Sequence, residues 1–264
     1  MSEASGSPPR PADRPFAMAM IALREAAFPS DRDIFAALAR QWPDVPAPQE
    51  HAPRASAVTF QLDRERGALS FVPSPIPWES LKGPCATAWY WPQAAEAMKA
   101  HRAHVIAGLG GGPADAVTRR LWLTALAGAV ASAAGPTACG LLWPGGMVVH
   151  APEPFLDRAR EMSRGSLPLE LWIDFRIFRE SEDTLTLFTT GLAEFGLPDL
   201  EIRRSRRPFK EVYAAAFNTA HYLIDQGPVL KDGDTLGLAA GETVLVHHVE
   251  SRWGHGRTIL SIRY

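Results

Sequence analysis

The stretch PFKEVYAAAFNTAHYLIDQGPVLKDGDTLGL, residues 208–238, predicts one long helix, a tight turn and the start of a strand. Apolar side chains recur along one face of this predicted helix, at Tyr213, Phe217, Ala220 and Ile224. Pro208 suits a first turn, and Gly227-Pro228 provides a glycine and a stop signal at the end. Asp232-Gly233 then favours a turn before an extended pattern. We expect this helix to cover a sheet formed by the second half of the chain.

The composition indicates a globular protein. Of 264 residues, 46% are hydrophobic and 21% are charged, which is enough for one large core or two moderate domains. The formal net charge is -2, so no overall attraction to nucleic acid or to an anionic membrane is expected. No run of about eighteen apolar residues occurs. We expect a cytoplasmic protein of bacterial type, with neither nucleic acid nor membrane as a partner.

Two features of the sequence bear on the cellular compartment. The two cysteines, Cys85 and Cys139, fit no metal-ligand spacing, and we expect free thiols in a reducing cytoplasm. Residues 1–14 are rich in proline and serine and lack an apolar core, so we interpret them as a disordered tail rather than a signal peptide.

The order of elements predicts an α+β fold of mixed, mainly antiparallel sheets with helices on one face. Residues 15–135 read as strand, helix, two strands, helix and strand, which is the ferredoxin-like order. Residues 136–264 read as a second half, with strands before and after the helix that follows Pro208. Gly110-Gly111-Gly112-Pro113 follows a strand but lacks the lysine and serine or threonine of a phosphate-binding loop. No cofactor is therefore expected.

Several short segments together resemble a family. They are Ile76-Pro77-Trp78, Gly83 to Thr87, His101 to His104, Leu171 to Phe175, Thr189 to Leu192 and Ala220 to Thr235. The resemblance is to a bacterial family catalogued as domain of unknown function 4261, whose domain would cover the chain from about residue 200 onward. It implies a shared fold but no reaction, and it assigns no site residues.

One catalytic hypothesis concerns the long predicted helix. Asn218, His221 and Asp225 form a polar ridge beside its apolar face, and an imidazole between an amide and a carboxylate can act as a general base. We favour the alternative that His221 packs structurally and hydrogen-bonds the turn at Asp232-Gly233. That turn itself is interpreted as aspartates that bond their own backbone.

A metal hypothesis rests on His248, Glu250 and His255 near the end of the chain. His248 and Glu250 share one face of a predicted strand, whereas His247 points to the opposite face. No established metal-binding spacing supports the set, so no metal is expected.

Binding is the remaining class of function. Four large rings, Trp78, Trp89, Tyr90 and Trp91, either line a pocket or interface or close the end of a sheet. The basic run Arg203-Arg204-Ser205-Arg206-Arg207 is interpreted as a solvated strand-to-helix connection rather than a phosphate site. We expect a non-catalytic protein that binds a protein or a small molecule. The alternative is a small-substrate hydrolase that uses His221, or His248 with Glu250.

Overall fold

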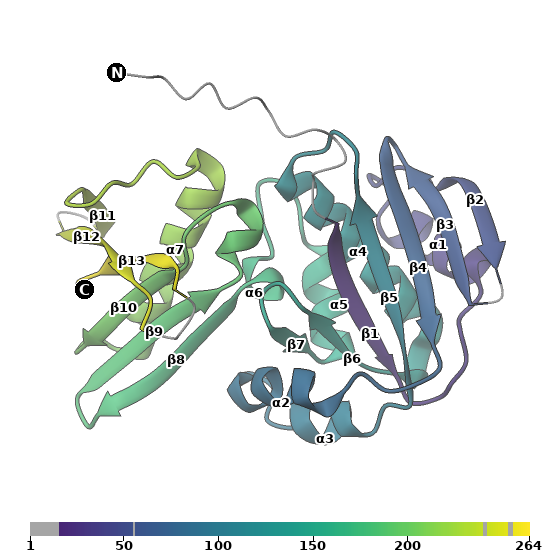
Figure 1. The fold of residues 1–264 in the computed structure, drawn as a ribbon, viewed down its shortest axis with the longest axis horizontal. Coiled ribbons are helices and arrows are strands. Elements are labelled where there is room, and N and C mark those ends of the chain that lie inside the picture. Colours follow the sequence, from purple (N-terminus) through teal and green to yellow (C-terminus); the bar gives the residue numbers. More distant parts are fainter. Residues whose placement is uncertain (1–15, 55, 240–241, 253–255) are drawn as a thin grey trace. The chain divides into compact units, whose positions relative to one another are not determined.

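A computed structural model describes the chain in four ranges, residues 16–54, 56–239, 242–252 and 256–264. The chain divides into two compact units (Figure 1). The first comprises the chain up to residue 81 and residues 93–142 and 150–162, and the second comprises residues 82–92, 143–149 and 163–264. The fold is α+β with two mainly antiparallel sheets, as predicted. The tail predicted at residues 1–14 lies outside the described ranges.

The first unit is built on a seven-stranded sheet. In spatial order its strands are β2 (Gln49–Arg54), β3 (Ala57–Leu62), β4 (Glu65–Val72), β5 (Ala103–Gly110), β1 (Ala17–Leu23), β6 (Ala138–Trp143) and β7 (Val148–His150). Helix α4 (Ala116–Ala134) packs on β1 and β5, and α1 (Asp31–Gln41) and α5 (Pro152–Arg160) pack against α4. Figure 1 shows these three helices on one face of the sheet.

The ferredoxin-like prediction for the first half was wrong. In that fold the first strand lies beside the third, but here β5 lies between β4 and β1 and pairs antiparallel with both. The physical reason is burial, because seven of the eight residues of β5 are buried and such a strand belongs in the middle of a sheet. β6 also pairs with β1, so the first sheet continues past the boundary predicted at residue 135.

The helix predicted at residues 87–100 is interrupted. Two helices occupy this part of the chain, α2 (Trp78–Thr87) and α3 (Ala94–Lys99). Pro92 lies between them, and a proline disfavours helical backbone at the residue before it, which accounts for the gap.

In the first unit, a hydrogen bond links two of the segments that carry the resemblance, the one that begins at Ile76 and the one that begins at His101. The backbone N–H of Ile76 donates to Nε2 of the buried His101 over 2.6 Å, and Nδ1 of His101 donates to the carbonyl of Met98. Nδ1 of His104 donates to the carbonyl of Ser74 over 2.8 Å. Because Nε2 of His101 accepts a hydrogen bond, this imidazole is neutral in the folded protein. Burial lowers the pKa of His101, against the opposing effect of the Met98 carbonyl.

The second unit is built on a six-stranded sheet. In spatial order its strands are β11 (Thr235–Ala239), β12 (Glu242–Glu250), β13 (Thr258–Ile262), β10 (Leu200–Ser205), β9 (Thr184–Thr190) and β8 (Asp174–Ser181). The short helix α6 (Leu169–Trp172) precedes β8. All pairings are antiparallel except that of β10 with β13, which is parallel.

The long helix predicted after Pro208 is confirmed as α7 (Phe209–Gln226), with Pro208 at its N-cap and Gly227 at its C-cap. Its most buried face includes Val212, Ala216 and Leu223. Tyr213 and Phe217, which were predicted at the centre of that face, are half-buried at its side, where both rings contact Phe175. The helix was therefore predicted correctly, but its buried face is rotated toward Val212.

The state of the cysteines and the character of the helices were also predicted from the sequence. Cys85 and Cys139 are buried free thiols, as predicted. Within the four described ranges, none of the helices has the length and apolar character needed to cross a bilayer.

The neutral state of His101 predicts acid sensitivity. Its folded pKa lies below its unfolded value, so below about pH 6.5 the unfolded chain binds a proton that the native protein does not. The free energy of unfolding should therefore fall on acidification, by at most about 1.4 kcal/mol per pH unit from this residue. Urea unfolding from about pH 7.5 to about pH 5.5 measures the slope. His101→Gln should flatten it; an unchanged slope would contradict the assignment.

Candidate functional site

The two faces of the second sheet differ in character. Helix α7 packs on β8, β9 and β10, and paired residues on one face, Ile202, Val246 and Ile262, are fully buried. On each strand the residue adjacent to the buried one points to the other face. There the register aligns one residue from each of five strands, namely Arg176, Phe188, Glu201, Ser261 and His247. A largely polar row therefore crosses the sheet on the side away from the Ile202 core.

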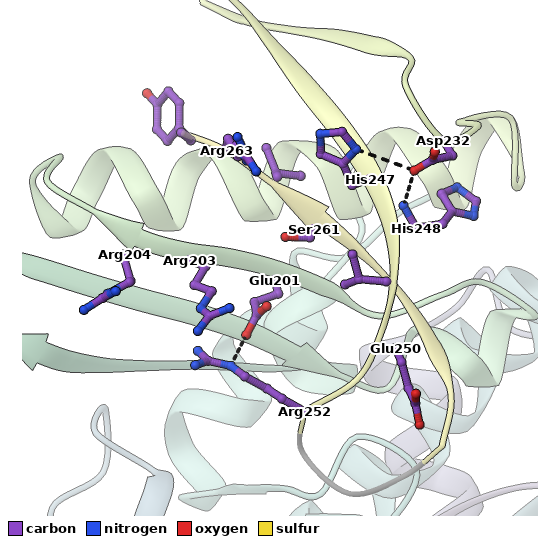
Figure 2. Close-up of a pocket in the computed structure, with 13 residues that line it drawn as sticks. Glu201, Arg203, Arg204, Asp232, His247, His248, Glu250, Arg252, Ser261 and Arg263 are labelled. Carbon is purple, nitrogen blue, oxygen red and sulfur yellow. Dashed lines mark hydrogen bonds and ion pairs between the residues drawn. The ribbon is translucent and has the colours of Figure 1, made fainter.

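A pocket of about 910 Å³ lies over β10, β12 and β13 (Figure 2). Its charged lining residues are Glu201, Arg203, Arg204, Asp232, Glu250, Arg252 and Arg263. Ser261, His247, His248 and Tyr264 are the other polar lining residues. All of them belong to the second unit. Small-molecule pockets span roughly 300–1,000 Å³, so the volume suits a small organic ligand.

Arg252 ties two strands together beside the pocket. Its Nε donates to Glu201 over 2.7 Å and its Nη2 donates to Glu180 over 2.8 Å (the Glu201 bond is drawn in Figure 2). Glu201 is only 3% exposed, so its carboxylate depends on this partner. The hydrogen bond from Arg252 lowers the pKa of Glu180. Burial alone would lower the pKa of Arg252, but the two acids raise it.

A bulge in β10 brings a second arginine to Glu180. The register with β9 shifts between Ile202 and Ser205, and Arg204 has a φ of 51°, which is uncommon for a residue other than glycine. The backbone N–H of Arg204 donates to Thr186 Oγ1 over 3.0 Å, and its Nε lies 3.3 Å from Glu180. Such outliers cluster at functional sites, and this one places two consecutive arginines at the pocket.

Arg203 and Arg263 carry the charge that remains. The parallel register ends at Ile202↔Ile262, and Arg203 and Arg263 each follow the last paired residue, Arg203 within β10 and Arg263 just beyond the end of β13. Both side chains are exposed, and within the described ranges neither has an acidic partner. Like charges that line one pocket repel one another. The pocket lining therefore includes two guanidinium groups that have no acidic partner among the described residues.

The other end of the pocket is formed by the Asp-Gly turn that the sequence predicted. Gly233 has a φ of 83°, and its N–H donates to the carbonyl of Val246 over 2.9 Å. Asp232 Oδ1 accepts from the N–H of His248 over 2.9 Å and lies 3.6 Å from Nδ1 of His247. The His248 hydrogen bond, followed by His247, lowers the pKa of Asp232. This end is acidic.

The catalytic candidates on α7 lie elsewhere. Asn218 and Asp225 are exposed, and neither they nor His221 are among the residues that line this pocket. Among the described residues, no hydrogen bond joins His221 to the turn, where Asp232 accepts from the N–H of His248.

The metal candidates do not converge. Nε2 of His248 donates to the carbonyl of Leu230 over 3.0 Å, which fixes the segment after α7. Glu250 lies on the same face of β12, as predicted, and both residues line the pocket. His255 lies outside the described ranges. Within those ranges no three histidine, cysteine, aspartate or glutamate side chains are placed to hold a metal ion.

The predicted aromatic cluster is divided between the two units. Trp78 belongs to the first unit, where Lys99 Nζ lies 4.5 Å from the centre of its ring. Trp89 and Tyr90 belong to the second unit and form an edge-to-face pair. Trp89, 48% exposed, also contacts Phe209 at the start of α7. Trp91 is half-buried in the second unit. The four rings are therefore divided between the two units.

Comparison with known proteins matches one segment of the chain, and that segment contains most of the pocket residues. Residues 188–262 match a family model described as a domain of unknown function, DUF4261. No curated protein and no solved structure matches the chain. The matched segment includes Glu201, Arg203, Asp232, His247 and Ser261, so most of the pocket lies inside the domain.

The pairing of Arg252 with Glu201 predicts a stability effect. Arg252→Ala should cost about 2–3 kcal/mol of unfolding free energy, because Glu201 would remain as a buried charge without a partner. The value lies below that for a fully buried pair because the Arg252 side chain is 32% exposed.

The matched control is the double variant Arg252→Ala/Glu201→Gln. It should recover much of the loss, since no buried charge remains. Urea unfolding measures all three proteins. Equal losses in the single and the double variant would show that the pair does not hold this face together.

Proposed function

We propose that this chain, a member of the DUF4261 family, is a non-catalytic binding protein whose ligand site is the pocket on the second sheet. The ligand in this proposal is a small anion. The observation that carries the proposal is that Arg203 and Arg263 both line the pocket, are exposed and have no acidic partner in the described ranges.

The local charge balance supports an anionic ligand. Four arginines, Arg203, Arg204, Arg252 and Arg263, face two acids, Glu180 and Glu201. Subtracting two negative charges from four positive charges leaves +2 around the arginines, although Glu180 does not line the pocket. The lining as a whole has four arginines and three acids, because Asp232 and Glu250 lie away from the arginines, so the positive excess is confined to the arginine end. A repelling pair that the fold does not neutralise breaks an ordinary rule of sheet design, and such breaks are expected at functional sites.

The alternative function, a hydrolase, has weaker support. The ring of His248 is engaged by Leu230, and His221 does not line the pocket. In the proposal the protein acts in the cytoplasm, and neither nucleic acid nor a membrane is its partner, because the overall charge attracts neither.

Thermal unfolding with increasing inorganic phosphate, sulfate or citrate tests the proposal. At least one of these anions should stabilise the wild-type protein saturably, by about 2.7 kcal/mol at a hundred times its Kd. Arg203→Gln and Arg263→Gln should remove this stabilisation. Without ligand, each should leave the protein as stable as before or raise the free energy of unfolding by up to about 1 kcal/mol, because a repulsion is relieved.

Arg206→Gln is the matched control. Arg206 is exposed, follows the same strand and does not line the pocket, and its substitution changes the net charge equally. This variant should keep the response to the anion. The proposal fails if no anion stabilises the protein saturably, or if all three glutamine variants lose the response equally.

A further inference from the structure

We infer that the ligand is the phosphate monoester of a small molecule, with its phosphoryl group held between Arg203 and Arg263. This inference rests on the proposed function of the pocket and narrows its ligand to one chemical class.

The charge and the shape of a phosphoryl group match two guanidinium groups. Each guanidinium group presents a planar fork of N–H donors that fits two oxygens of a phosphoryl group. Both forks belong to residues that line the pocket, Arg203 within β10 and Arg263 just beyond the end of β13. A phosphate monoester carries close to two negative charges at neutral pH, because its second pKa is about 6. That charge balances the local +2, whereas a carboxylate or a sulfate ester balances only half of it.

The second argument is the availability of a neutral donor. Ser261 lies on β13, and its register neighbours Glu201 and His247 line the pocket with it. Ser261 is half-buried, and within the described ranges its hydroxyl makes no hydrogen bond. The acid beside it, Glu201, is already engaged by Arg252. Ser261 can therefore donate to an oxygen of a phosphoryl group between the arginines.

The third argument concerns the rest of the ligand. The pocket of about 910 Å³ is far larger than a phosphate ion. Its lining away from the arginines includes Asp232 and Glu250, which are exposed acids. These carboxylates repel further anionic groups but accept hydrogen bonds from hydroxyl or amino groups. The ligand therefore carries one terminal phosphoryl group on a body with hydrogen-bond donors, and a polyphosphate or a nucleic-acid strand is disfavoured.

Isothermal titration of the full chain with phenyl phosphate and phenyl sulfate tests the inference. The two esters share a shape but differ in charge. Phenyl phosphate should bind at least about tenfold more tightly at about pH 7.5, and the preference should shrink toward about pH 5, where it carries one charge. Arg203→Lys and Arg263→Lys should each weaken phenyl phosphate binding by about tenfold, because the charge remains but the fork is lost. Arg206→Lys should leave it unchanged.

The outcomes separate the inference from the proposed function. Equal affinity for the two esters, or full affinity in both lysine variants, would overturn the phosphate inference and leave anion binding intact. The same holds if a single-stranded oligonucleotide displaces phenyl phosphate and binds more tightly. If neither ester binds, and inorganic phosphate, sulfate and citrate also fail to stabilise the protein, the proposed function itself fails.

Discussion

The ion pair between Arg252 and the buried Glu201 is the interaction on which the pocket-bearing face of the second sheet, the open face opposite the Ile202 core, depends for its stability. A carboxylate that is 3% exposed must be compensated, and Arg252 does so from the chain beyond β12 while it also binds Glu180. Because Arg252 binds Glu201, the acid nearest to Arg203 in the sequence is not available to pair with Arg203. The stability of the face and the free charge of the pocket therefore have the same cause.

The backbone of β10 positions the arginines that line the pocket beside this ion pair. Residues before the bulge alternate between the Ile202 core and the open face, and the bulge brings Arg204 to the pocket together with Arg203. The parallel register with β13 ends at Ile202↔Ile262, and Arg263, which follows it, also lines the pocket. At the far end, Asp232 binds the backbone of β12 and gives the pocket an acidic rim. A pocket with opposite charge at its two ends orients a ligand that has one anionic group.

The sequence predicted this architecture where the signals were local. Helix α7 and the turn at Gly233 follow from proline, glycine and aspartate at particular offsets, and both formed as expected. Strand pairing is a long-range property, so the element order of the first half did not reveal that β5 lies between β4 and β1. The site depended on such pairing as well. Arg252 and Arg263 carry no local signal in the sequence, and only the folded sheet brings Arg252 to Glu201 and places Arg263 in the same pocket lining as Arg203.

The central claim is that Arg203 and Arg263 form one anion site while Arg204 and Arg252 are already engaged. The most direct measurement is a titration with inorganic phosphate, followed by NMR on the Nε–H groups of the arginines. The account predicts saturable shifts at Arg203 and Arg263 with a common Kd, and little change at Arg252. Shifts that grow linearly without saturation, or that are equal at Arg206, would contradict it.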